Sequence, residues 1–175
     1  MKLVFDTSVL SCFARAELLD VLEQVSRSHE RLVPRAVLGE LKRGLADYPK
    51  LATVLDATWL EEVPVDALEE LTAFAHYARR LSAGDRNIGE ACVLAWAEVH
   101  EATAVVDDQV AVQCARERGV QVVRSLAFVS TGLKKNLFDE ARARHVVDAL
   151  VKLGGARFPC DGAGFVAWAR QNGLL

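Results

Sequence analysis

The chain lacks closely spaced cysteines: its four thiols form no C-x-x-C pair and stand at Cys12, Cys92, Cys114 and Cys160. Such spacing argues against a zinc site, and we expect reduced, mostly buried thiols in a cytoplasmic protein. No apolar run approaches the roughly 18 residues of a membrane span. The N-terminus leads straight into an apolar strand, so we expect no signal peptide.

An excess of basic residues is also missing. There are 21 Lys and Arg against 24 Asp and Glu, which gives a net charge of −3. This balance excludes a protein that coats nucleic acid with a basic surface all round. A local rim of basic residues around an acidic centre is compatible with it.

Hydrophobic residues are plentiful, at 51% of 175 residues, which suits one domain over residues 1–175. Short apolar runs predict strands that alternate with longer helical patterns, and this alternation indicates a parallel α/β sheet. The predicted strands are 3–5, 31–33, 59–63, 103–106 and 121–123. The predicted helices are 8–15, 17–26, 35–45, 50–57, 66–81, 85–99, 108–118, 126–133, 139–153 and 161–171.

Acidic residues follow two of these strands. Asp6 comes directly after Leu3-Val4-Phe5, and Asp107-Asp108 follows Ala104-Val105-Val106. Because parallel strands end at one edge of their sheet, we expect these carboxylates on the same edge, where open α/β sheets bind ligands. An Asp before a helix is also a common N-cap, but one cap explains only one acid of the pair.

Two further acids lie within helical patterns. Glu40 borders the apolar stripe of the 35–45 helix, and its simplest alternative is a surface ion pair with Arg43. Glu90 lies in a helix that is apolar on both sides, where an unpaired charge is costly. A salt bridge with Arg86 or a bound metal ion would each compensate the buried charge of Glu90. We expect Asp85 to be the N-cap of this helix.

Asp6, Glu40, Glu90 and Asp108 are separate in sequence and include no histidine. Oxygen-only ligands favour a hard cation, Mg²⁺ or Mn²⁺, over zinc. Without a cation, clustered carboxylates would repel one another and raise their own pKa values.

The ordered set Asp6-Thr7-Ser8, Glu40 after Val33-Pro34, Glu90 and Asp108 resembles the acidic quartet of PIN-domain nucleases, most closely the VapC-type ribonuclease toxins. The resemblance covers about residues 1–150, so the tail from about 154 is the less certain part of the domain. The third acid is commonly Asp in that family, and here it is Glu90.

The resemblance implies a three-layer α/β/α sandwich with a central parallel sheet of four to five strands. It also implies a metal-dependent endoribonuclease that hydrolyses RNA phosphodiester bonds, with Asp6, Glu90 and Asp108 holding Mg²⁺ or Mn²⁺. Ser8 and Asp107 would support the ligands. A homodimer and an antitoxin protein are the expected partners of a VapC-type toxin.

Basic residues occur in small clusters, most of which suit a solvated surface. Arg15 and Arg86 lie nearest in sequence to the acidic elements and are the first candidates for phosphate contacts.

Other classes are possible for a chain with acids at strand ends. A catalytically inactive PIN-fold binding module would keep these acids as caps and ion pairs, and a non-toxin RNA-processing nuclease would keep the chemistry without an antitoxin. A receiver-like signalling domain would need its acid pair after the first strand, and a haloacid-dehalogenase-type phosphatase would need Asp in place of Ser8.

Overall fold

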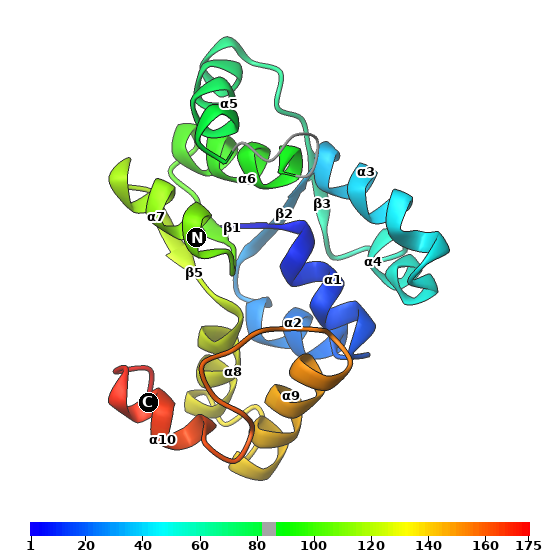
Figure 1. Cartoon of the computed structure of the whole chain (residues 1–175), viewed down its shortest axis with the longest axis vertical. Coiled ribbons are helices and arrows are strands. Elements are labelled where there is room, and N and C mark those ends of the chain that lie inside the picture. The colour runs from blue at the N-terminus through cyan, green and yellow to red at the C-terminus, as the bar shows by residue number, and fades with distance from the viewer. Residues whose placement is uncertain (82–86) are drawn as a thin grey trace.

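The computed structural model describes residues 1–81 and 87–175. Its centre is a five-stranded parallel sheet with the strand order β3-β2-β1-β4-β5 (Figure 1). The strands are β1 Lys2–Phe5, β2 Glu30–Pro34, β3 Glu61–Val63, β4 Thr103–Val105 and β5 Gln121–Val123. The predicted α/β class, with a parallel sheet of four to five strands, is confirmed.

Helices cover both faces of this sheet. One group contains α5 Leu68–Arg80, α6 Ile88–Val99 and α7 Gln109–Glu117. The other contains α1 Thr7–Arg15, α2 Leu19–Ser26, α4 Ala52–Leu55, α8 Ser125–Lys134 and α9 Glu140–Lys152. Helix α3, Arg35–Arg43, packs against both α1 and α6, and α10, Phe165–Gln171, packs against α9. Figure 1 shows the two groups on opposite sides of the sheet, as a three-layer sandwich requires.

Strand β1 is central because its side chains are apolar on both faces. Leu3, Val4 and Phe5 are all 1% exposed or less. β1 pairs with β2 on one side and with β4 on the other, where Phe5 is opposite Val105. This register fixes where β1 and β4 end, and therefore which residues reach the carboxyl edge together.

The ends of several helices differ from the predicted ones. Asp66 does not cap α5, because the Glu70 carboxylate folds back and accepts hydrogen bonds from the backbone N–H groups of Asp66 (2.8 Å) and Ala67 (3.0 Å). Helix α10 begins at Phe165, four residues later than expected. The predicted cap Asp85 lies outside the described residues.

The expected burial of most cysteines is confirmed. Cys12, Cys92 and Cys114 are buried and Cys160 is half-buried, all without a disulfide, while Trp96 is 7% exposed. Among the described helices, none has the length and hydrophobicity needed to cross a bilayer.

The C-terminal helix shares the core of the sheet. Phe165 is fully buried and belongs to the same apolar cluster as β1. We therefore expect Phe165→Ala to lower the free energy of unfolding of the whole chain by about 3–5 kcal/mol, the cost of removing a buried ring.

Denaturant unfolding followed by circular dichroism checks this expectation, with the exposed Gln171→Ala of the same helix as the control. One transition that shifts as a whole supports a single domain over residues 1–175. Loss of α10 alone, with the main transition unmoved, would contradict it.

Candidate active site

Asp6 lies at the carboxyl end of β1 and caps α1. Its Oδ2 accepts hydrogen bonds from the Ser8 backbone N–H (3.0 Å) and the Ser8 hydroxyl (2.5 Å). Asp6 is only 3% exposed, and this burial raises its pKa despite the opposing Ser8 bonds. The contact expected between Ser8 and the first acid is therefore present, and it uses one carboxylate oxygen.

Asp107 and Asp108 have different partners beyond β4. Asp108 Oδ1 accepts hydrogen bonds from the Val110 and Ala111 N–H groups (2.8 and 3.0 Å), which makes Asp108 the N-cap of α7. Asp107 instead accepts hydrogen bonds from the Ser125 N–H (2.9 Å) and the Ser125 hydroxyl (2.5 Å) at the start of α8. Asp107 thus joins the ends of β4 and β5.

Glu40 makes no surface pair with Arg43. Its Oε1 accepts a hydrogen bond from the Gly89 N–H of α6 (2.8 Å), and its other oxygen accepts one from the Thr7 hydroxyl of α1. A Cβ at position 89 would lie 2.6 Å from Glu40 Oε2, so only glycine lets the carboxylate come this close. Glu40 therefore holds the first turns of α1 and α6 beside each other.

Glu90 is the most perturbed of the acids. It is 9% exposed, in a helix whose residues 89–97 are all buried. Burial, followed by the charges of Asp6, Asp108 and Glu40, raises the pKa of Glu90 to about 8. The pairing with Arg86 that we considered lies outside the described residues, as does the proposed RNA contact of Arg86.

The four predicted acids line one pocket of about 550 Å³ at the carboxyl edge of the sheet. Asp107, Ser8 and Arg15 line it too. Sequence reasoning missed its remaining basic residues and its C-terminal wall, which are Arg124, Arg157 and the segment 154–158. A signal existed for Arg124, which directly follows the last strand just as Asp6 follows the first.

The chemistry of these donors fits a hard divalent cation. Cys12 also lines the pocket, but burial, followed by the charge of Asp107, raises its pKa to about 12, so the thiol stays protonated. That leaves carboxylate oxygens, the ligands that Mg²⁺ and Mn²⁺ prefer.

The side chains are not arranged as a finished coordination sphere. Within residues 1–81 and 87–175, no group of three or more Asp, Glu, His or Cys is placed to hold a metal ion. Asp6 and Asp108 each commit one oxygen to a helix cap, and Glu40 commits both of its oxygens to hydrogen bonds. Asp6, Glu90 and Asp108 are the residues that would hold such an ion, since Asp6 and Asp108 each keep one oxygen outside their caps.

Comparison with known families assigns the chain. The DUF3368 family model, described as a PIN domain, matches residues 2–161. The chain therefore belongs to the PIN-domain family, whose members are generally nucleases and typically use divalent metal ions. The match extends past residue 150, so it includes the segment 154–158 that lines the pocket. No curated protein and no solved structure matches the chain significantly.

The raised pKa of Glu90 makes stability depend on pH. Because the folded protein holds this proton more tightly than the unfolded chain, the contribution is fully present below about pH 4.5 and is lost as the pH rises toward 8. We expect metal-free Glu90→Gln to lose this dependence of the unfolding free energy on pH and to be more stable than wild type at pH 8. The gain should be about 2 kcal/mol or more, since a tenfold change in proton affinity corresponds to about 1.4 kcal/mol.

Denaturant midpoints in EDTA at pH 5 and pH 8 measure this difference, with Glu69→Gln, an exposed position on α5, as the matched control. Equal slopes of unfolding free energy against pH for wild type and Glu90→Gln would show that neither burial nor the neighbouring carboxylates raise the pKa of Glu90.

Proposed function

We propose that the protein is a metal-dependent endoribonuclease that hydrolyses RNA phosphodiester bonds with Mg²⁺ or Mn²⁺. The observation that carries this proposal is the meeting of Asp6, Glu90 and Asp108, from three different elements, around one pocket in a PIN-domain fold. Burial and the charges of the neighbouring carboxylates raise the pKa of Glu90, and a divalent cation would stabilise such an environment.

In this proposal Asp6, Glu90 and Asp108 hold the ion. A bound ion of this kind supplies a Lewis acid for the phosphate and lowers the pKa of a coordinated water. Ser8 fixes the Asp6 carboxylate through two hydrogen bonds, so its second oxygen faces a defined direction. Glu40 acts as a positioning residue, because both of its oxygens are used to hold α1 and α6 together.

Asp107 supports the site from the other side. Its two hydrogen bonds with Ser125 fix the first turn of α8, and its backbone carbonyl accepts a hydrogen bond from Arg124 (2.8 Å). This arrangement holds one guanidinium group in the pocket lining beside Asp108.

Asparagine substitutions separate ligation from capping. Asn is as good an N-cap as Asp, so Asp6→Asn and Asp108→Asn should keep their helix caps while losing a charged ligand. We expect both variants to fold and to cleave RNA at least about 100-fold more slowly, and wild-type activity to disappear in EDTA. Cleavage of a labelled single-stranded RNA measures the rates, with Asp139→Asn, the cap of α9, as control.

Thermal melts test the same site without relying on activity. Mg²⁺ should stabilise wild type by an amount set by its concentration relative to Kd, about 2.7 kcal/mol at 100 times Kd, and Asp108→Asn much less. Without metal, Asp108→Asn should be at least as stable as wild type, because it relieves repulsion. Equal Mg²⁺ shifts in the two proteins would contradict a metal site at Asp108, and undiminished cleavage by both variants would contradict the proposed mechanism. A wild type that binds RNA without cleaving it would make an inactive binding module the better description.

The likeness to VapC-type toxins adds partners to this proposal. A toxin of that type would be neutralised by an antitoxin that covers the pocket and presents Arg to its carboxylates, a charge-assisted contact. The hydrophobic content of 51% and the exposed Leu68 and Leu71 on α5 support a homodimer. Light scattering at about 50 µM, well above typical dissociation constants of stable dimers, should give twice the monomer mass of 19.1 kDa, and a monomer would contradict this.

A further inference from the structure

One face of α1 forms a side of the pocket. Ser8, Ser11, Cys12 and Arg15 all line it, at helical positions that share a single face. Asp6 lies at the start of this face and Arg15 in its last turn. At a rise of about 1.5 Å per residue, nine residues separate the two backbones by about 13 Å. Asp6 and Arg15 therefore lie at opposite ends of this helix face.

The C-terminal chain passes closely over this face. After α9 the backbone returns across α1, the orange loop in Figure 1. A Cβ at Gly154 would lie 2.6 Å from Cys12 Sγ and 2.7 Å from the Cys12 carbonyl oxygen, and the Cys12 thiol donates to the Leu150 carbonyl (3.6 Å). The segment 154–158 is thus fixed against α1 and forms a wall of the pocket.

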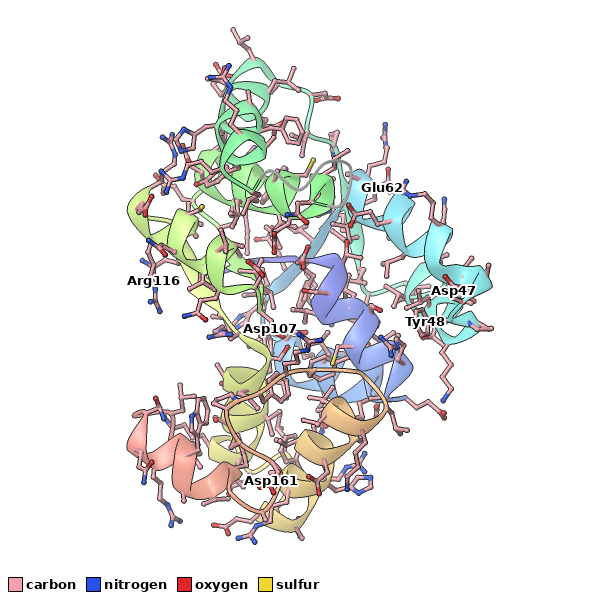
Figure 2. The ribbon with its side chains drawn as sticks, viewed as in Figure 1. Asp47, Tyr48, Glu62, Asp107, Arg116 and Asp161 are labelled. Atoms are coloured by element: carbon pink, nitrogen blue, oxygen red, sulfur yellow. The ribbon has the colours of Figure 1, made fainter. Side chains whose placement is uncertain are left out.

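Arg15 is held between this segment and an exposed ring. Its guanidinium carbon lies 4.1 Å from the centre of the Tyr48 ring, which is 44% exposed. A Cβ at Gly155 would come within 3.2 Å of Arg15 Nη2, and Gly155 has a positive φ of 79° that favours glycine. Figure 2 shows Tyr48 on the turn that follows α3, well away from Asp107. The Arg15 guanidinium is therefore oriented before any ligand arrives.

Two more guanidinium groups come from other elements. Arg124 donates to the Asp107 carbonyl (2.8 Å) and lies 4.0 Å from Asp107 Oδ1, while half of its side chain stays exposed. Arg157 extends from the wall itself and is exposed. Three arginines from separate parts of the chain thus line one pocket of a protein whose net charge is −3.

We propose that the segment 154–158, α1 and Arg124 after β5 form a track for single-stranded RNA, on which Arg15, Arg124 and Arg157 bind phosphates that flank the scissile one. This inference rests on the proposed function. A polyanion must approach a pocket lined by carboxylates, and guanidinium groups at its walls offset that repulsion with bidentate phosphate contacts. Arg15 lies at the other end of α1 from Asp6, so we assign it to a nucleotide next to the scissile phosphate.

Binding without cleavage tests the track. Fluorescence anisotropy of a labelled single-stranded RNA in EDTA, at several salt concentrations, compares Arg15→Ala, Arg124→Ala and Arg157→Ala with wild type. We expect each variant to bind about tenfold more weakly and to reduce the slope of log affinity against log salt by about 0.7, the value for one lost phosphate contact.

Arg116→Ala is the matched control, because Arg116 is an exposed arginine on α7 outside the pocket (Figure 2). Arg15→Lys guards against a folding artefact. It keeps the charge and the salt slope but loses the planar fork and should bind with intermediate affinity.

The outcomes separate this inference from the nuclease proposal. Weaker binding and smaller slopes in the three pocket variants support the track even if wild type never cleaves RNA. Affinities and slopes equal to those of Arg116→Ala would overturn the track, as would wild type that fails to bind RNA at about 50 mM salt, even if metal-dependent cleavage is observed.

Discussion

The carboxylate of Glu40 joins the elements that carry the other acids. It accepts hydrogen bonds from the Gly89 N–H and the Thr7 hydroxyl, so one side chain links α3 to the first turns of α1 and α6. Hydrogen bonds to an ionised acceptor are roughly twice as strong as neutral ones. Gly89 is part of this constraint, because any Cβ there would overlap the carboxylate. The position of Glu90, one residue further along α6, relative to the end of β1 therefore depends on Glu40.

Helix capping and ligand binding are compatible uses of the same acids. In parallel α/β folds the strands end where the following helices begin, so N-caps and ligand sites share one edge of the sheet. Asp6 and Asp108 each cap a helix with one oxygen and keep the other for the pocket. The cost of this arrangement is concentrated at Glu90, which is buried among carboxylates and has its pKa raised to about 8.

Local patterns predicted the strands, together with Asp6 and Asp108, from short apolar runs and the residues directly after them. Glu40 and Glu90 were identified from their positions on the apolar faces of predicted helices. The prediction of β5 is exact at Gln121–Val123. The helix ends were predicted less accurately. Side chains such as Glu70 set them through hydrogen bonds that the hydrophobic periodicity of the sequence does not show. The bond between Glu40 and Gly89 spans 49 residues and has no sequence signal of its own. The pocket wall at 154–158 was missed for the same reason, because its contact with Cys12 joins residues that are far apart in the sequence.

The distribution of charge in the pocket links the two proposals. Among the described residues, five carboxylates and three guanidinium groups line it, so without a cation the carboxylates repel a phosphate while the guanidinium groups attract one. A bound divalent ion would remove part of that repulsion, and RNA would in turn add oxygen ligands near the ion. Coupling between two ligands is reciprocal, so each would raise the affinity of the other by the same factor. In the proposed function, a chain with net charge −3 would bind RNA at this edge because the ion and the arginines act together there.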